Sequence, residues 1–323
     1  MRTDASLVCF LGRAPNFAPA RSPAASNQYS MLNITIRRKA RQLARIVRGS
    51  VLTRRSGQWH RPVLVTNGQL ALTFIGHSGF FIQTGGKNVL VDPNFARWLF
   101  ILKRLRHAGL RVKDLPPVDY VLITHAHFDH LNRPSLRAIA RASKRRCGQA
   151  PKIIVPHQVA DLVACLGFRE VIELKWWQSH SDDAISVTHV PSRHWGARMI
   201  HDFHRGYGGY VIRSQKHSVY HAGDTAYFEG FREIGTRLHP ELALLPIGAY
   251  EPPSFRTVHT SPEDAIRAFK DLGADRMVPM HYGTFRLSHE PMDEPLKRLA
   301  SAAEAAGVSD RVLVLTEGVT GLL

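Results

Sequence analysis

Four side chains that commonly bind metal ions occur within six residues, in the run HAHFDH at 125–130. The run directly follows an apolar, strand-like stretch. In extended chain alternate side chains point to the same side, so His125, His127 and Asp129 can converge on one volume, and His130 adds an imidazole from the turn. A catalytic zinc with an open position uses three protein ligands. The run exceeds that number and predicts a site for two metal ions.

Three further candidate ligands lie downstream, where β-rich runs of the sequence meet loops. His194, Asp224 and His281 each follow such a run within a few residues. In α/β proteins the ends of strands are where binding sites are built. A carboxylate such as Asp224 can bridge two cations, which leaves imidazoles to complete the coordination of each ion. The sequence therefore predicts one centre assembled from distant parts of the chain.

Strand-like and helix-like patterns alternate from about residue 70 onwards, which predicts a mixed α/β layered domain. The predicted strands are 70–75, 79–83, 88–91, 120–124, 152–155, 185–190, 209–212, 218–222, 242–246 and 276–279. Helix-like stretches are 96–109, 134–146 and 157–166, and Ser261-Pro-Glu-Asp264 reads as a helix start with a capping box.

The ordered set HAHFDH, His194, Asp224 and His281 resembles the metallo-β-lactamase superfamily over about residues 68–323. The resemblance implies an α/β fold, a four-layer αβ/βα sandwich, with a dinuclear site in the cleft between its halves. It also implies the allocation of ligands. The first metal would be held by His125, His127 and His194, the second by Asp129, His130 and His281, with Asp224 bridging them.

A narrower likeness is carried by the stretches SRHWGAR (192–198), AGDTAY (222–227), LPIGAYEP (245–252) and MHYGTF (280–285). They look like the branch that contains N-acyl-phosphatidylethanolamine-hydrolysing phospholipase D, and more loosely like the bacterial L-ascorbate-6-phosphate lactonases. His259 matches that branch's histidine near the metals. The likeness implies phosphodiester hydrolysis of the phospholipase D type by a metal-bound hydroxide, with Asp224, His259 and Asp129 in the catalytic set.

Two residues near the predicted centre have supporting roles in this interpretation. Asp92 ends a strand-like run and is a candidate to orient a ligand imidazole, or else to cap the turn before Pro93. His77 is a candidate to line the cleft. Zinc is the expected metal, and an imidazole-rich site with carboxylates also accepts iron or manganese.

Alternative functions stay open at this stage. The same site supports hydrolysis of a soluble lactone or phosphorylated metabolite. A nuclease is disfavoured because only 57 residues separate Asp224 from His281, which leaves no room for a large inserted clamp, and no aromatic-basic RNA motif is evident. A non-enzymatic metal-binding protein is disfavoured by the complete ligand set. Neither the physiological substrate nor the oligomeric state can be read from the sequence.

Positive charge is concentrated at the N-terminal end. Residues 1–60 contain eleven Lys and Arg and one acid, a net charge of +10, out of +17 for the whole chain of 323 residues. Residues 1–30 are expected to be disordered, and Met31 is an alternative start. Residues 31–67 form a predicted basic amphipathic segment and linker, whose helix at 32–52 either packs on the domain or lies on anionic lipid. The lipid alternative predicts peripheral contact with an anionic membrane through residues 32–55, and contact of this helix with nucleic acid is a third alternative.

The three cysteines are widely spaced, which predicts neither a disulfide framework nor a cysteine zinc site. Together with the absence of a recognisable secretory signal, this favours a cytoplasmic protein, in part peripheral at the membrane surface. The apolar-basic segment 98–106 is expected to be an ordinary helix that buries Leu99, Ile101, Leu102 and Leu105, with a lipid-facing element as the alternative.

Overall fold

The computed structural model describes residues 44, 47–49, 51–66, 68–199 and 201–323. The chain divides into two compact units, 1–45 and 46–323. Apart from Ala44, the first unit lies outside the described residues, and with it the predicted disordered tail and most of the predicted basic helix. The described positions at the end of that helix, 47–49 and 51–52, are helical. The second unit is the one described below.

Seven strands form the first sheet. In spatial order they are β15 (Thr320–Leu322), β1 (Ala71–Gly76), β2 (Gly79–Thr84), β3 (Lys87–Val91), β6 (Tyr120–Leu122), β7 (Lys152–Pro156) and β8 (Glu170–Leu174). The pairs from β15 to β3 are antiparallel, whereas β3, β6, β7 and β8 run parallel. The carboxyl ends of these four strands therefore lie at one edge.

Six strands form the second sheet. In spatial order they are β14 (Arg276–Met280), β13 (Leu242–Pro246), β12 (Ser218–His221), β11 (Gly209–Ser214), β10 (Ile185–Val190) and β9 (Ser179–Ser181). Here β12, β13 and β14 run parallel and the remaining pairs are antiparallel. Each sheet thus combines a parallel and an antiparallel part.

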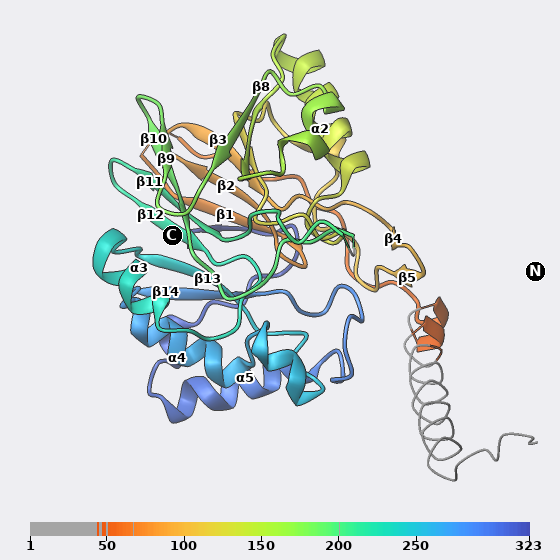
Figure 1. Ribbon diagram of the computed structural model, residues 1–323, viewed down its shortest axis with the longest axis vertical. Coiled ribbons are helices and arrows are strands. Elements are labelled where there is room, and N and C mark those ends of the chain that lie inside the picture. The colour runs from red at the N-terminus through yellow and green to blue at the C-terminus, as the bar shows by residue number, and fades with distance from the viewer. Residues whose placement is uncertain (1–43, 45–46, 50, 67, 200) are drawn as a thin grey trace, which may run out of the picture. The chain divides into compact units, whose positions relative to one another are not determined.

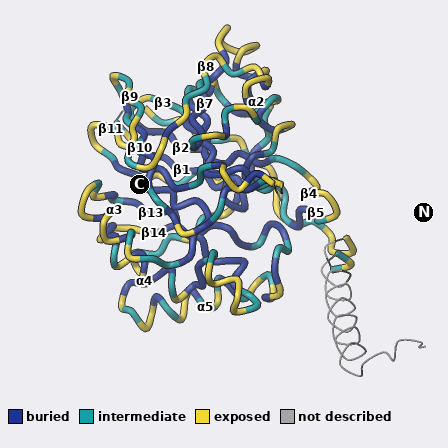
Figure 2. Tube along the Cα trace, viewed as in Figure 1, coloured by how far each residue is buried: buried dark blue, intermediate teal, exposed yellow. Residues whose placement is uncertain are grey.

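The two sheets pack face to face between helices (Figures 1 and 2). The helices are α2 (Arg133–Cys147), α3 (Gly230–Leu238), α4 (Pro262–Leu272) and α5 (Glu294–Ala305), with 3-10 turns η1 (Val112–Asp114), η2 (Ala160–Leu162), η3 (Ala164–Leu166), η4 (Pro253–Thr257) and η5 (Ser309–Arg311). Phe74 and Phe80 belong to the core shared with the second sheet, whereas Ile75 and Phe81 belong to the core beneath α2. Because both faces of the first sheet are covered, its central strands are apolar throughout. The predicted four-layer αβ/βα sandwich is confirmed.

The prediction of a helix at 96–109 is wrong. The segment forms a hairpin of β4 (Trp98–Leu99) and β5 (Leu102–Lys103), with Phe100 at φ 52° in the turn. Ile101, which a helix would have buried, is 51% exposed. Aromatic and β-branched side chains favour extended backbone, and over so short a segment tertiary contacts override an approximately helical spacing.

Other elements also differ from expectation. The helix expected at 157–166 consists of the short turns η2 and η3, in a segment with β-branched Val159 and Val163, and Gly167 ends it at φ 94°. Helices α3 and α5 and strands β8, β9 and β15 were not predicted. α3 contains Gly230 and Gly235, which weaken its helical signal.

Two further observations concern membrane-spanning helices and the cysteines. Among the described residues no helix is both long and apolar enough to cross a bilayer. Cys147 and Cys165 are exposed free thiols.

The predicted N-cap serine and first-position proline of α4 are confirmed, and the Asp264 carboxylate accepts from the Ser261 hydroxyl at 3.0 Å. The Ser261 hydroxyl accepts a hydrogen bond from the Asp264 backbone N–H at 3.2 Å, and Pro262 occupies the first helical position. Replacing Ser261 with Ala should lower the free energy of unfolding by about 1 kcal/mol, because an N-terminal amide loses its partner. Urea unfolding followed by circular dichroism measures the change. Ser301→Ala, at an exposed interior position of α5, is the control and should have little effect.

Candidate metal centre

The loops at the carboxyl ends of the parallel strands in both sheets meet at one place. Two backbone hydrogen bonds join them: Gly208 N–H donates to Thr124 O at 3.1 Å, and His281 N–H donates to His77 O at 2.8 Å. Gly223 also makes a close approach, since a Cβ there would lie 2.7 Å from Gly208 O and its φ is 64°. Only glycine fits these constraints well. The neighbouring residue, Asp224, is thereby brought against the loop that follows β6.

One cluster contains His125, His127, His194 and Asp224, with one candidate ligand atom from each lying within 4.8 Å of the others. His127 Nδ1 lies 2.8 Å from His125 Nε2 and 3.3 Å from His194 Nε2. Asp224 Oδ2 lies 3.8 Å from His125 Nε2 and 3.9 Å from His194 Nε2. These are the residues that the resemblance allocates to the first metal, together with the bridging carboxylate.

A second cluster contains His77, Asp129, His130 and His281. Asp129 Oδ2 lies 3.7 Å from His130 Nε2 and 3.8 Å from His281 Nε2. His77 Nε2 donates a hydrogen bond to the same carboxylate oxygen at 2.9 Å. His77 was expected only to line the cleft. Its position directly after β1, in a Gly-His-Ser-Gly turn, is the sequence signal that could have indicated direct contact with a metal ligand.

Asp224 connects the two clusters. Its Oδ2 lies 3.1 Å from His281 Nε2, 3.3 Å from His130 Nε2 and 3.7 Å from His259 Nε2. Asp224, His259 and His281 form a third group that could hold an ion. The structure therefore brings all seven predicted ligands and His259 into one site.

A hydrogen-bonded relay fixes which nitrogen of two histidines carries a proton. Because a carboxylate only accepts, His130 Nδ1–H must donate to Asp92 Oδ2 at 2.7 Å, and the Thr124 hydroxyl must also donate to that oxygen at 2.6 Å. The Thr124 hydroxyl, having used its proton, accepts from His125 Nδ1–H at 2.9 Å. His194 Nδ1–H donates to Val258 O at 2.9 Å. In the neutral imidazoles of all three histidines Nε2 is left unprotonated and faces the centre.

The predicted contact of Asp92 with a histidine of the HAHFDH run is thus confirmed. Asp92 also accepts from the Thr124 backbone N–H through Oδ1 at 2.8 Å. Asp92, His77 and His281 hold positive φ values of 44°, 62° and 59°. Such backbone strain persists only where surrounding structure imposes it, and it clusters at functional sites.

Burial and mutual charge act in opposite directions on the site's pKa values. Burial lowers the pKa of His125 and His194 well below the ordinary value. Burial alone would raise the pKa of Asp224, but the His130 and His281 imidazoles outweigh it and hold that pKa well below its usual range. Burial opposes protonation of His281 as well, yet the Asp224 carboxylate raises its pKa to about 9. Without a cation, protons shared among imidazoles and carboxylates balance the buried negative charge.

The donor set suits divalent cations. His130 Nε2, His281 Nε2 and Asp224 Oδ1 are buried and have no hydrogen-bond partner among the residues that the structure describes. Buried polar atoms are normally satisfied, so orphaned ones that converge on one volume call for a charged partner. Unprotonated imidazole nitrogens with carboxylate oxygens are donors that zinc, iron and manganese accept. The clusters are consistent with two such ions.

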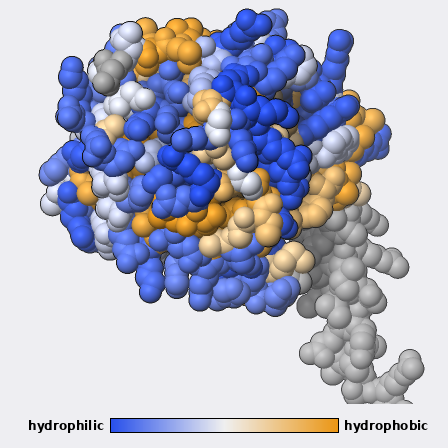
Figure 3. Space-filling view, turned by 90° about the horizontal axis from the view of Figure 1, so that it is seen from above, coloured by the Kyte–Doolittle hydropathy of each residue, from blue (hydrophilic) through white to orange (hydrophobic). Residues whose placement is uncertain are grey.

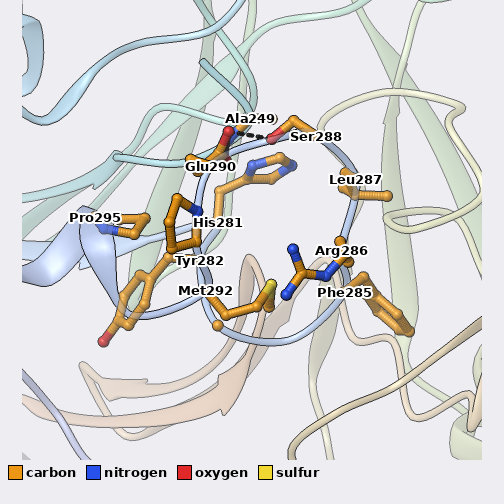
Figure 4. Close-up of a pocket in the computed structure, with 12 residues that line it drawn as sticks. Ala249, His281, Tyr282, Phe285, Arg286, Leu287, Ser288, Glu290, Met292 and Pro295 are labelled. Carbon is orange, nitrogen blue, oxygen red and sulfur yellow. Dashed lines mark hydrogen bonds between the residues drawn. The ribbon is translucent and has the colours of Figure 1, made fainter. Parts of the chain in front are cut away.

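The centre opens on the side of His127, Asp129 and His259, which are partly exposed. Trp195 stacks on His194 with ring centroids 4.4 Å apart. On the opposite side His281 lines a cavity of about 20 Å³, room for roughly one water molecule (Figure 4). There Glu290 accepts from the Ser288 hydroxyl and, at 2.7 Å, from Ala249 N–H, which fixes the wall behind the site.

Comparison with known proteins supports the same architecture. Residues 87–282 match the family described as beta-lactamase superfamily domain. The chain belongs to this superfamily. Igni18, a metallo hydrolase from Ignicoccus hospitalis, superposes with a TM-score of 0.57 at 27% identity, covering 79% of this chain and 98% of that one. The chain therefore has the fold and the histidine and aspartate clusters of the superfamily's metal-dependent hydrolases.

Two curated relatives are informative. A Mycobacterium tuberculosis protein described as uncharacterised is 34% identical over 252 residues, which is 75% of this chain. The match spans 66% of that relative's own length. N-acyl-phosphatidylethanolamine-hydrolyzing phospholipase D 1 of Caenorhabditis elegans is 29% identical over 253 residues, covering 73% of this chain and 71% of that protein. The matches to these relatives agree with the assignment of the chain to the superfamily.

Metal binding should release protons. In the metal-free protein His281 stays protonated below pH about 9, and a cation requires the neutral imidazole. Affinity for Zn²⁺ should therefore rise with pH by about tenfold per unit for each proton displaced, and this contribution should level off above pH about 9. Calorimetric titration in buffers of different ionisation enthalpy counts the protons. His281→Gln should release fewer, and an equal number from both proteins would contradict the assignment.

Asp92→Asn should lower Zn²⁺ affinity by about 10–100-fold, because an amide has one accepting oxygen, whereas the carboxylate accepts at Oδ2 from His130 and the Thr124 hydroxyl and at Oδ1 from the Thr124 backbone N–H. Competition with a metal-binding dye measures the affinity. Asp310→Asn, an exposed carboxylate in η5, is the matched control. Equal affinities for the two variants would show that Asp92 does not orient the ligands.

Proposed function

We propose that this chain is a dinuclear-metal-dependent hydrolase, a phosphodiesterase of the phospholipase D type that acts on N-acyl-phosphatidylethanolamine-like lipids. The observation that carries the proposal is the position of Asp224 Oδ2, within 4 Å of imidazole nitrogens from His125, His130, His194, His259 and His281. One carboxylate between two histidine clusters is an arrangement suited to two ions, and zinc is the proposed metal.

The metal ligands follow the allocation given by the resemblance. His125, His127 and His194 would hold one ion, Asp129, His130 and His281 the other, and Asp224 would contact both. Two divalent cations at such a site supply a nucleophile at neutral pH and stabilise charge on the phosphoryl oxygens. No serine or cysteine nucleophile is then required.

Two further histidines, the buried His77 and the partly exposed His259, have roles in the proposed reaction. His77 donates to Asp129 and keeps that carboxylate turned toward the second cluster. His259 is only partly buried, and its ring lies beside Asp224 and Trp195. Within the described part of the chain its Nδ1 has no hydrogen-bond partner. His259 is therefore placed to donate a proton to the leaving oxygen. Water oxygen bonds to phosphorus, the bond from phosphorus to the ethanolamine oxygen breaks, and phosphatidic acid and an N-acylethanolamine result.

The lipid substrate is supported by the Caenorhabditis elegans relative, whose described activity is hydrolysis of N-acyl-phosphatidylethanolamine. It is also supported by apolar side chains near the opening, among them Phe255, which is 36% exposed and lies 6.3 Å from the His259 ring. The expected contact of residues 32–55 with anionic lipid stays a prediction, since much of that segment lies outside the described residues.

A second candidate is hydrolysis of a soluble lactone or phosphorylated metabolite. The observation in its favour is the match to Igni18, which covers nearly all of a protein described only as a metallo hydrolase. The two candidates use the same centre and differ in what approaches the open side.

The deciding experiment is hydrolysis of N-acyl-phosphatidylethanolamine in mixed micelles by the metal-loaded full chain. N-acylethanolamine release should be detected, and Asp224→Ala should abolish it together with much of the bound metal, because that carboxylate would contact both ions. Asp310→Ala is the matched control and should retain activity. Faster turnover of soluble lactones or phosphoesters, without N-acylethanolamine release, would favour the second candidate.

A further inference from the structure

The charge of the folded domain is strongly polarised along the sequence. Residues 97–152 contain 13 Lys and Arg and 3 Asp and Glu, a net charge of +10. Residues 61–323 as a whole contain 32 basic and 25 acidic residues, a net of +7, so the other parts of this span sum to −3. The excess positive charge of the domain therefore belongs to one segment, which runs from the β4–β5 hairpin to the start of β7.

Helix α2 carries much of this charge on its outer face. Its cations recur at helical spacing and no acidic residue occurs in the helix. These cations are Arg133, Arg137, Arg141, Lys144 and Arg145, called the α2 stripe below. Within the described part of the chain, none of the five has an acidic partner within 4 Å. Like charges one turn apart repel, so the stripe favours an anionic partner.

An exposed apolar tip lies in the same segment. In the β4–β5 hairpin Trp98 is 40% exposed, Phe100 71% and Ile101 51%. Figure 3 shows apolar patches at several places on this face, one of them at the right-hand edge, the side on which the hairpin lies in Figure 1. Single exposed apolar residues are common, whereas three large ones grouped on one hairpin form a patch of the kind that marks an interaction site.

Direct contacts link the hairpin tip to the metal centre. Phe100 packs edge-on against Phe128 at 4.5 Å, and Phe128 lies between the candidate ligands His127 and Asp129. The Arg198 guanidinium covers the Phe128 ring at 3.8 Å. The same guanidinium donates hydrogen bonds to Ala126 O at 2.8 Å and to Leu131 O at 2.9 Å, two residues before α2 begins. The tip, the opening of the site and the start of the α2 stripe are therefore contiguous.

We infer that the β4–β5 tip and the α2 stripe form a docking surface for an anionic lipid bilayer, with Trp98, Phe100 and Ile101 entering the interface and the stripe facing the headgroups. The residues of this surface belong to the folded domain and lie outside the predicted basic segment at 31–67 in the sequence. The inference deepens the proposed function, since it would hold the open side of the centre at the lipid surface, but docking itself can be measured without turnover.

The combination favours a bilayer over a nucleic acid. A phosphate backbone would satisfy the cations but offers no apolar phase for Ile101. Aromatic and aliphatic side chains beside a basic face are the arrangement by which amphipathic surfaces bind anionic membranes. Each Lys or Arg near such a surface strengthens binding by about fivefold.

The experiment is co-sedimentation of the full chain with vesicles of phosphatidylcholine alone, or with a third of the lipid replaced by phosphatidylglycerol. Wild type should bind the anionic vesicles preferentially. Arg141→Glu with Lys144→Glu should weaken binding by about 25-fold or more, at two cations and about fivefold each. The matched control is Lys270→Glu with Arg276→Glu, which makes an equal charge change at exposed positions of α4 and β14. Its vesicle affinity should differ from that of wild type only through the long-range effect of the changed net charge, to within about twofold.

The hairpin is tested separately. Phe100→Asn with Ile101→Ser should reduce binding to the same vesicles by about tenfold or more, and asparagine tolerates the positive φ at position 100. Val314→Ser with Leu322→Ser, two comparably exposed apolar positions outside the hairpin, is the control. Thermal melting verifies that each variant is folded.

Three outcomes would overturn the inference. Equal vesicle binding by the α2 variant and its control would show that the α2 stripe does not contribute to docking. Equal binding by the hairpin variant and its control would show the same for the β4–β5 tip. Wild type that ignores vesicles but binds a short DNA duplex, with loss in the α2 variant, would assign the surface to nucleic acid. The tail is unchanged in every variant, so its contribution cancels. Asp224→Ala should bind vesicles like wild type, which separates docking from the proposed activity.

Discussion

The tautomers of two histidines in this centre, His125 and His130, depend on a single buried carboxylate. Asp92 accepts from His130 directly and from His125 through the Thr124 hydroxyl, so one group sets the tautomer of a residue in each cluster. Its position follows from the parallel register of β3 and β6, which puts the end of one strand beside the end of the other. A shift of that register would turn both Nε2 atoms away from the centre. The surrounding core maintains the arrangement by excluding water, which would otherwise compete for each of these hydrogen bonds.

The centre also requires both sheets. Asp129 and the histidines of the HAHFDH run come from the first sheet, whereas Asp224 and His281 follow strands of the second. Burial alone would raise the pKa of Asp224, but His130, which follows a strand of the first sheet, and next His281 hold it low. A histidine from the first sheet is thus the main partner that stabilises the buried carboxylate from the second. The sheet interface is therefore both the hydrophobic core of the domain and the condition for an organised site.

The sequence allowed the centre to be predicted better than its surroundings, for a physical reason. Histidine and aspartate are common metal ligands, and their alternation in the HAHFDH run predicts that they share one side of the chain. The family resemblance supplied their assignment to the first or the second metal. The role of Thr124 could not be predicted, because a threonine in a buried strand has many uses. His77 was underestimated since its link to Asp129 is made across the sheet. The hairpin was mistaken for a helix because its apolar spacing is nearly helical, and only its packing beside Phe128 distinguishes the two.

The long separation between ligands has a consequence for synthesis of the chain. His281 is added 156 residues after His125. At translation rates of about 5–20 residues per second this gap lasts roughly 8–30 s. Throughout that interval the emerging polypeptide presents the first histidine run while the second sheet is still incomplete, because β14 is the last of its strands to be made. A cation captured then would be held by a partial set of ligands, so correct metallation depends on β14 closing the site after most of the chain has been made.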